Sequence, residues 1–314
     1  MRHKVLPPLG RRLNTVLAAA ALVAASNLTW AQAPAVPVQH VNGETMVSTN
    51  PQKAVVMDLG VLDIVHALGG QVAGVPKANF PEHMAEYGQD RYAKLGTLFE
   101  PDFNAIKSLS PDLIVVGRRS AKTYPELAKI GPTLNLTFDQ QNLVESVAHN
   151  TRTVAALYNK RDQAEVLLEK LDKSVKDLQA RTNKAGKGLL VFTSGGKMIS
   201  QGPDSRFGVL FKGFGVQPAM TDFPEGKGIP LTPELLQTVN PDWIYVIDRD
   251  ASLGREGPSA QKLLNDAQVS QTTAGKQEQI VYLNPTNWYL LDGAGLTTMQ
   301  ANVEQLLAAM NAKQ

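Results

Sequence analysis

Three arginines lie in loops that follow predicted β-strands. Arg119, Arg206 and Arg249 are each within two residues of a glycine or an aspartate, and Arg118 is an immediate alternative to the first. A guanidinium group is permanently charged, and its planar fork of donors can bridge several oxygens of one anion. Taken alone, each arginine is more typical of a solvated or structural ion pair. Three of them in loops of two lobes predict an anion-binding cleft.

A second candidate is the segment Asn284-Pro-Thr-Asn-Trp-Tyr-Leu-Leu-Asp-Gly, in which Trp288 and Tyr289 closely follow a predicted strand. Aromatic residues in such a place either cover an edge of the core or stack on a ligand. The Tyr289 phenol is also an oxygen ligand suited to ferric iron, or a hydrogen-bond donor to a chelate. We expect both aromatic residues to lie near the ligand, with these two roles of Tyr289 open.

Other kinds of site have little support in the sequence. A G-x-S-x-G motif, a phosphate-binding loop and the glycine spacing of a dinucleotide site are all absent. Without cysteine, a first-row metal site would depend largely on histidine. The histidines beyond residue 31 are His40, His66, His83 and His149. All lie in the first half of the chain, which disfavours a bare zinc or manganese site between two lobes.

The N-terminus has the three parts of a secretory signal peptide. Residues 1–12 are basic, residues 13–28 are mostly Leu, Ala and Val, and Thr29-Trp30-Ala31 is a small-x-small cleavage site. The apolar stretch is short for a membrane anchor, which needs about 20 apolar residues, and no cysteine follows it to accept a lipid. We therefore predict removal of residues 1–31 and a freely soluble periplasmic protein.

The net charge differs between this leader and the rest of the chain. All 314 residues together carry a formal charge of +2, but the leader holds four basic residues and no acidic one, so the mature charge is −2. A general binder of nucleic acid or of anionic membranes would have the opposite bias. The charge therefore predicts neither partner.

The elements that must position the candidate residues alternate between short strands and helices. The predicted strands are Ala54–Met57, Gln71–Val75, Leu113–Val116, Thr133–Phe138, Leu189–Thr193, Trp243–Ile247 and Ile280–Leu283. The predicted helices are Leu62–Leu68, Phe80–Tyr87, Phe103–Leu109, Pro233–Val239, Ala260–Ala267 and Leu296–Asn311. This alternation is typical of parallel, doubly wound α/β units. At roughly 150 residues per domain, the length predicts two of them.

One amphipathic stretch separates the two runs of alternating elements. From about Asn142 to Ala180 apolar residues recur at helical spacing, and Asn159 offers a point for a break. We interpret the stretch as a rigid connector, although a surface helix within one domain would show the same pattern. The predicted organisation is a signal peptide over 1–31, an N-terminal α/β lobe over 32–150, a connector helix over 151–184 and a C-terminal α/β lobe over 185–314.

The two lobes share a repeated segment. Residues 104–116 align without a gap on residues 234–246, and each segment predicts a short helix, a Pro-Asp turn and a buried strand. The same register places Arg119 opposite Arg249, just past the end of each strand. Ligands of open α/β sheets bind outside these carboxyl ends. Reuse of a common helix-turn-strand unit explains the Pro-Asp pairs but not the paired arginines, so the repeat favours a shared cleft.

With these motifs the chain resembles the periplasmic substrate-binding components of iron–siderophore ABC importers, of the helical-backbone class, and within them the branch that binds ferric catecholates. The resemblance covers about residues 40–312. Its most specific stretches are residues 56–60, 111–120, 202–208, 240–249 and 287–293. It implies an α/β fold of two Rossmann-like lobes with parallel sheets, joined by a long connector α-helix, known as a class III periplasmic binding protein.

The resemblance also implies roles for the candidate residues. The three cleft arginines of the family match Arg119, Arg206 and Arg249. Its tyrosine, which can complete iron coordination when the siderophore leaves sites open, matches Tyr289. Glu225 occupies the place where this branch often has a histidine as a second such ligand. That departure favours recognition of a fully coordinated chelate.

In the wider class, a surface carboxylate on each lobe meets arginines of the membrane permease. Glu234 matches the position on the second lobe. Its counterpart in the first lobe by the repeat is Asn104, and Glu100 or Asp102 can substitute for it. Solvated loop acids are the other interpretation of these residues.

Together, the residues and the resemblance predict a non-enzymatic, monomeric periplasmic receptor. It would capture a ferric siderophore of the catecholate type and deliver it to an inner-membrane ABC importer. Ferric iron is cargo inside the chelate, so no tightly bound cofactor is implied. A haem or cobalamin carrier is the nearest alternative. An α/β enzyme is a more distant one, because the second lobe has no His or Cys to serve as base or nucleophile.

Overall fold

The computed structural model describes residues 1–4, 34–224 and 227–313. The chain divides into two units, Met1–Gln32 and Ala33–Gln314, and the second is the folded body. Residues 5–31 of the predicted signal peptide lie outside the described residues. Among the described residues, no helix has the length and apolar character needed to cross a membrane.

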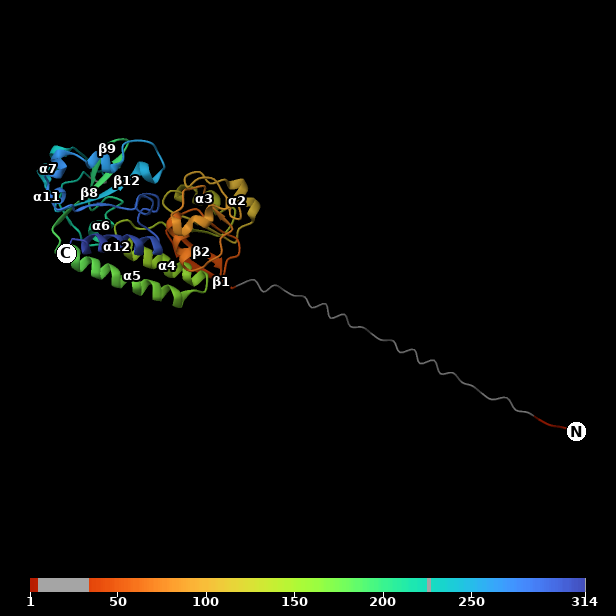
Figure 1. Cartoon of the computed structure of the whole chain (residues 1–314). Coiled ribbons are helices and arrows are strands. Elements are labelled where there is room, and N and C mark those ends of the chain that lie inside the picture. Colours follow the sequence, from red (N-terminus) through yellow and green to blue (C-terminus); the bar gives the residue numbers. More distant parts are fainter. Residues whose placement is uncertain (5–33, 225–226, 314) are drawn as a thin grey trace. The chain divides into compact units, whose positions relative to one another are not determined.

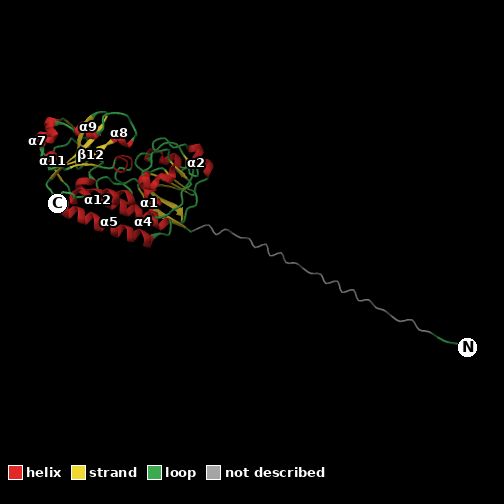
Figure 2. Ribbon diagram, viewed as in Figure 1, coloured by secondary structure: helices red, strands yellow, loops and turns green. Residues whose placement is uncertain are grey.

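The first lobe carries α2 (Phe103–Leu109) in Figures 1 and 2. It is built on a five-stranded sheet of order β5-β4-β3-β6-β7, in which all pairs are parallel. Its strands are β3 (Ala54–Val56), β4 (Gly74–Val75), β5 (Ala93–Lys94), β6 (Leu113–Val116) and β7 (Thr133–Asn135). Its helices are α1 (Leu59–Ala67), η1 (Glu82–Gly88), α2 (Phe103–Leu109), η2 (Ala121–Thr123) and α3 (Tyr124–Leu127). The central strands β3 and β6 are apolar and buried throughout, as parallel strands covered on both faces must be.

An antiparallel hairpin precedes this sheet. It consists of β1 (Ala35–His40) and β2 (Gly43–Ser48), where the sequence predicts only an extended lead-in. Gly43 closes its turn with φ +115°, in a region that glycine enters freely. The Val41 N–H donates to the Asn135 carbonyl at 3.2 Å, which ties the hairpin to the end of β7.

The second lobe contains a six-stranded sheet of order β11-β9-β8-β12-β13, with β10 paired to β8. Its strands are β8 (Lys187–Ser194), β9 (Lys197–Gln201), β10 (Gln217–Pro218), β11 (Ile229–Leu231), β12 (Trp243–Asp248) and β13 (Ile280–Tyr282). The pairs of β8 with β12 and of β12 with β13 are parallel, as predicted. The short strand β10, which the sequence does not predict, also pairs with β8 in parallel. The antiparallel strands β9 and β11 are an addition. Strand β9 returns from β8 through the turn Gly195-Gly196, where both residues have positive φ, instead of through a helix.

Short helices connect the strands of the second lobe. They are α6 (Val209–Lys212), α7 (Pro233–Val239), α8 (Arg249–Ser252), α9 (Ala260–Leu264), α10 (Ala267–Ser270), α11 (Thr273–Lys276) and the π-helical turn η3 (Thr286–Leu290). The turn η3 follows β13 and carries the aromatic pair of the sequence motif.

Three longer helices, α4 (Leu143–Leu157), α5 (Arg161–Thr182) and α12 (Leu296–Asn311), link the lobes (Figure 1). The predicted connector over 151–184 begins inside α4 and is two helices, because the chain turns at Asn159 with φ +56°. The apolar stripe of α5 is buried, and α5 packs on both α4 and α12. Since α12 also packs on α1, it fastens the connector to the first lobe.

The internal repeat appears in both lobes as the same local structure. Helices α2 and α7 end at Ser110 and Asn240, which have φ values of +50° and +46°. The carboxylates of Asp112 and Asp242 then accept hydrogen bonds from backbone N–H groups at the start of the neighbouring parallel strand, at 2.9 and 2.7 Å. Each Pro-Asp turn therefore fixes the start of its strand, β6 or β12. It thereby also positions the loop that follows the carboxyl end of that strand.

Candidate functional site

A cavity of about 490 Å³ lies between loops of the two lobes. Its wall includes Lys77, Phe99 and Arg119 from the first lobe and Arg249, Arg255 and Tyr289 from the second. Arg119 follows β6 and Arg249 follows β12, the two strands of the repeat. The cavity thus lies at the carboxyl ends of the strands, where open α/β sheets bind ligands. Four of these six side chains are cationic, which favours an anion.

Tyr289 is the point at which the three predicted arginines meet. The Arg249 Nε donates to its Oη at 2.7 Å. The Nη2 groups of Arg119 and Arg206 donate to its carbonyl oxygen, at 2.9 and 3.4 Å. The guanidinium carbon of Arg206 lies 4.5 Å from the centre of its ring. Segments far apart in sequence therefore converge on one residue, as the sequence predicts, and the π-helical turn that carries it is a local geometry often found at functional sites.

Asp292 is a further member of this cluster whose role the sequence analysis missed. Its side chain is 7% exposed and accepts charge-assisted contacts from three guanidinium groups. The distances are 2.7 Å to Arg118 Nη2, 3.0 Å to Arg119 Nη1 and 3.3 Å to Arg206 Nη1. Asp292 lies within the motif of residues 287–293, but nothing local to that motif shows that three distant arginines reach it.

Arg118 and Arg119, which the sequence leaves as alternatives, both contact Asp292. The side chain of Arg119 is 9% exposed, and its Nη1 also donates to the Leu290 carbonyl at 2.8 Å. The side chain of Arg118 is 37% exposed, and among the described residues it donates to Asp292 alone. Arg119 lines the cavity, which agrees with its place opposite Arg249 in the repeat.

The charged groups of the cluster are largely buried, and burial and neighbouring charges shift the pKa values of Arg206 and Asp58. Burial lowers the pKa of the Arg206 guanidinium, Asp292 opposes that effect, and the charges of Arg119 and Arg118 reinforce it. Burial also raises the pKa of Asp58, which caps the start of α1 and feels the charge of Arg119. Excess positive charge in a partly desolvated site favours an incoming anion.

Trp288, which the sequence predicts to lie near the ligand, is not part of the cavity wall. Trp288 is fully buried and makes an edge-to-face contact with Phe214, with ring centres 6.2 Å apart. Its neighbour Tyr289 is only partly buried and reaches the cavity. In η3 the two consecutive side chains point to different sides, so Trp288 belongs to the core and anchors the turn that presents Tyr289.

Of the two positions that the resemblance relates to iron coordination, only Tyr289 lies among the described residues. Glu225 lies outside the described residues. Within the described residues, no three His, Asp or Glu side chains are grouped so that they could hold a metal ion. Coordination of Fe(III) by the Tyr289 phenol stays a prediction.

The acidic residues expected at the permease surface are both exposed. Glu234 lies in the first turn of α7, and a hydrogen bond from Thr232 lowers the pKa of its carboxyl group. Glu100 lies in the tight loop before α2, where its backbone N–H donates to the Thr97 hydroxyl at 3.0 Å. Asn104 and Asp102 are exposed as well, and Asp102 is occupied as the N-cap of α2.

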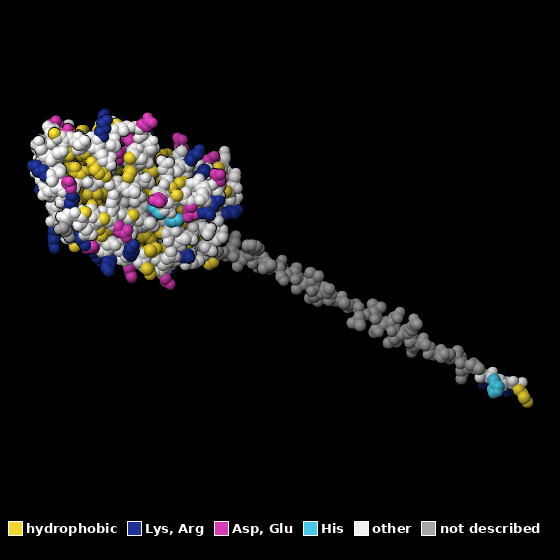
Figure 3. All heavy atoms as spheres, viewed as in Figure 1, with side chains coloured by type: hydrophobic (Ala, Val, Ile, Leu, Met, Phe, Trp, Pro, Cys, Tyr) yellow, Lys and Arg dark blue, Asp and Glu magenta, His cyan; other side chains and the backbone are white. Residues whose placement is uncertain are grey.

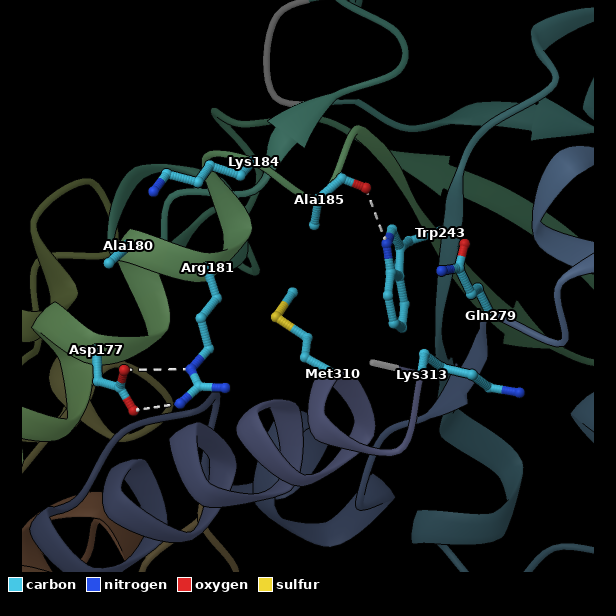
Figure 4. A pocket seen from close by; sticks show the side chains of 9 residues that line it. All are labelled: Asp177, Ala180, Arg181, Lys184, Ala185, Trp243, Gln279, Met310 and Lys313. Carbon is cyan, nitrogen blue, oxygen red and sulfur yellow. Dashed lines mark hydrogen bonds and ion pairs between the residues drawn. The ribbon is translucent and has the colours of Figure 1, made fainter.

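A larger hollow, of about 570 Å³, lies at the other end of the second lobe (Figure 4). Trp243, at the start of β12, forms part of its wall, whereas Arg249 follows the end of that strand. Two of its cations already have acidic partners: Arg181 pairs with Asp177 at 3.1 Å, and Lys313 pairs with Glu278 at 3.1 Å. The interlobe cavity is the smaller of the two but the better candidate for the site, because it lies at the carboxyl ends of the parallel strands and is lined by Tyr289, on which the three arginines converge.

Two α/β lobes joined by long helices, with cationic loops facing each other across a cavity, define a two-lobed substrate-binding protein. The sequence profile of the family described as "Periplasmic binding protein" matches residues 54–286, and the chain belongs to that family. Membership confirms the predicted fold class and the expectation of a non-enzymatic binding protein.

Relatives in this family resemble the chain over most of its length. The petrobactin-binding protein YclQ of Bacillus subtilis is 35% identical over 266 residues, which are 83% of this chain and 83% of that protein. The ferric-anguibactin-binding protein FatB of Vibrio anguillarum is 28% identical over 278 residues, 86% of each. The crystal structure of the periplasmic catecholate-siderophore binding protein VctP of Vibrio cholerae matches with a TM-score of 0.81 at 31% identity, and covers 88% of this chain and 99% of that one.

Proposed function

We propose that the protein is the siderophore-binding component of an ABC iron importer and that it captures an anionic ferric siderophore of the catecholate type. The observation that carries this proposal is the convergence of three arginines, from both lobes, on Tyr289 at the wall of the interlobe cavity. Guanidinium forks suit the negatively charged oxygens of such a chelate. The description of VctP as a catecholate-siderophore binding protein supports the catecholate type, and the ferric ligand named for FatB supports an iron chelate.

Capture needs no chemical step, because iron is cargo within the chelate. Tyr289 Oη accepts a hydrogen bond from Arg249, so its own proton is free to reach an oxygen of the ligand. Lys77 and Arg255 add positive charge at the cavity wall, and the exposed ring of Phe99 offers an apolar surface beside it. In this arrangement the protein recognises the outer surface of a fully coordinated chelate. A siderophore that leaves iron sites open would allow Tyr289 to coordinate the metal.

We further propose that the mature protein is soluble in the periplasm, works as a monomer and delivers its ligand to an inner-membrane permease. On the face shown in Figure 3, Lys and Arg side chains are interspersed with Asp and Glu over both lobes. A nucleic acid or an anionic membrane would require a continuous basic field. The interspersed charges, together with the predicted mature charge of −2, support a small anionic ligand held within the cleft instead.

The decisive experiment is a titration of the purified mature protein with ferric tris-catecholate, ferric trihydroxamate, haemin and cobalamin. We expect saturable binding of the catecholate, with quenching of tryptophan emission, because the ligand would bind beside the turn that holds Trp288. Isothermal calorimetry on the same samples gives the affinity independently of fluorescence. Saturation by haemin or cobalamin without binding of the catecholate would replace this proposal with one of the alternative carriers.

A further inference from the structure

Asp292 is a buried carboxylate held between arginines of both lobes. Arg118 and Arg119 reach it from the loop after β6 of the first lobe, and Arg206 reaches it from the second lobe. Its neighbours occupy both carboxylate oxygens: Arg118 donates to Oδ2 at 2.7 Å, and Arg119 donates to Oδ1 at 3.1 Å. One anion thus bridges cations from segments more than 80 residues apart in sequence.

The backbone at Asp292 is also unusual. Its φ is +55°, and Gly293 follows with φ +72°. A non-glycine residue in this left-handed region is uncommon, although aspartate and asparagine tolerate it best. Such a conformation persists where the surroundings hold it in place. The surroundings of Asp292 include the three guanidinium groups and the hydrogen bond from the Gly293 N–H to the Asn287 carbonyl at 2.9 Å.

The three arginines differ in how much they depend on Asp292. Arg119 is the most buried and also donates to the carbonyl groups of Tyr289 and Leu290. Arg118 is 37% exposed, and among the described residues its side chain donates to Asp292 alone. Arg206 is 28% exposed, donates to the Tyr289 carbonyl at 3.4 Å and lies 4.4 and 4.5 Å from the ring centres of Phe207 and Tyr289. A ligand with negatively charged oxygens would therefore draw Arg118 away from Asp292 most readily and Arg206 less readily, while Arg119 stays in place.

We propose that Asp292 is a built-in counter-anion, a positioning residue that holds the arginines of both lobes together in the free receptor and competes with the ligand for them. This inference rests on the proposed function, because it concerns the same cleft. In the free protein, Asp292 offsets the repulsion among guanidinium groups brought close together. In the complex the chelate supplies that negative charge, and Asp292 then repels it. The residue consequently stabilises the free protein and lowers its affinity for highly charged ligands.

The test is Asp292→Asn, which keeps the size of the side chain and its tolerance of positive φ. We expect the variant to bind a ferric tris-catecholate, with three net negative charges, about fivefold more tightly at low salt. The gain should be smaller for a ferric bis-catecholate, with one net negative charge, and should shrink as salt screens the site. Equal or weaker binding of the tris-catecholate, with the salt dependence of the wild type, would overturn the inference.

A second measurement needs no siderophore, so it separates this inference from the proposed function. The free Asp292→Asn protein should melt several degrees below the wild type, and inorganic phosphate should restore its melting temperature more than it raises that of the wild type. If wild-type protein binds no ferric catecholate but the variant shows this response to phosphate, the proposed function fails and the counter-anion stands. An unchanged melting temperature with no differential response to phosphate would refute the counter-anion.

Two further variants separate the effect of the Asp292 charge from a loss of folding and from effects outside the cleft. Arg118→Gln combined with Asp292→Asn removes one charge of each sign, so the double variant should fold even where Asp292→Asn alone does not, and should bind within about threefold of the wild type. Asp177→Asn is the matched control, because Asp177 also pairs with an arginine, Arg181, but outside the cleft (Figure 4). It should change neither affinity nor the response to phosphate. A double variant that remains unfolded would show that the balance of charge does not explain the role of Asp292, and would refute the counter-anion.

Discussion

At the scale of single residues, Arg249 and Tyr289 define how the cleft presents its charge. Arg249 Nε donates to Tyr289 Oη at 2.7 Å, and its Nη1 donates to the Ser194 hydroxyl at 3.1 Å and lies 3.7 Å from a carboxylate oxygen of Asp250. Among the described residues, its Nη2 group has no hydrogen-bond partner. When a donor is already fixed in direction but has no partner, binding of a ligand loses little side-chain entropy at that group. Arg249 is therefore the arginine best prepared to meet an anion.

We predict that Arg249→Ala weakens binding of an anionic ferric chelate by about 1.5–3 kcal/mol, the range for a hydrogen bond to a charged group, or roughly 10- to 150-fold in Kd. Calorimetric titration measures the change. Arg152→Ala serves as the control, because Arg152 pairs with Glu165 on the outer surface at 2.8 Å and should leave the affinity unchanged. An unaltered Kd for Arg249→Ala would remove this residue from the site.

The sequence predicts a shared cleft for the arginines and Tyr289, because each is predicted in a loop or turn after a strand, and the structure brings these residues together. The contacts of Asp292 and the direction of Trp288 could not be predicted in this way. Asp292 gains its role from three partners in distant loops. The orientation of Trp288 depends on the π-helical register of η3, which local propensity does not specify. Residue type and spacing thus predict where a site forms. Which charged residues of that site pair with one another can be read only from the tertiary structure.

At the scale of elements, a buried carboxylate joins α1 to α12. Asp63 of α1 accepts hydrogen bonds from the backbone N–H groups of Thr297 and Thr298, at 2.8 and 3.0 Å, and from the Thr298 hydroxyl at 2.7 Å. Helix α12 begins after Gly295 without a side-chain cap of its own. Asp63 therefore caps α12 from another helix, and its charge complements the positive end of the helix dipole. Nε2 of His83 lies 2.8 Å from the same carboxylate.

We predict that Asp63→Ala lowers the free energy of unfolding by about 3–5 kcal/mol, because it leaves buried donors without their acceptor. Equilibrium unfolding in urea measures the change. The matched comparison is Asp102→Ala, which removes the exposed N-cap of α2 and should cost only about 1 kcal/mol. Equal losses in the two variants would show that the contact between α1 and α12 adds nothing to ordinary capping.

The elements that the sequence predicts well are those with local signals. Helices α2, α7 and α12 and strand β6 have the predicted bounds, because a Pro-Asp turn or a glycine-rich turn marks an end of each. The sequence does not predict the hairpin β1–β2 or the strands β9 and β11. These strands are short and half exposed, and their pairing depends on a neighbouring edge instead of on their own pattern. Turn residues in the local sequence therefore predict the elements of the parallel core. Edge strands can be predicted only when the neighbouring strands of the sheet are known.

At the scale of the whole molecule, the repeat gives the two lobes equivalent outer helices. Helices α2 and α7 precede the Pro-Asp turns and lie at the outer sides of their lobes (Figure 1). Glu234 stands at the start of α7, whereas the equivalent position in α2 is Asn104. The nearest exposed acid without a capping role is Glu100, four residues earlier. A pair of acids, one on each lobe, would let a permease contact both lobes at once.

We predict that Glu234→Lys lowers transport by the reconstituted importer on the order of tenfold or more, since it places like charges opposite each other at the permease, and that Glu100→Lys has a similar effect. Both variants should keep the wild-type Kd for the chelate, because neither residue lines the cleft. Glu169→Lys, on the exposed side of α5, is the control and should transport normally. Ligand-stimulated ATP hydrolysis in proteoliposomes measures the coupling, and titration of the same samples measures binding. A defect in Glu234→Lys without one in Glu100→Lys would assign the contact of the first lobe to another residue, and normal coupling in both variants would exclude this docking surface.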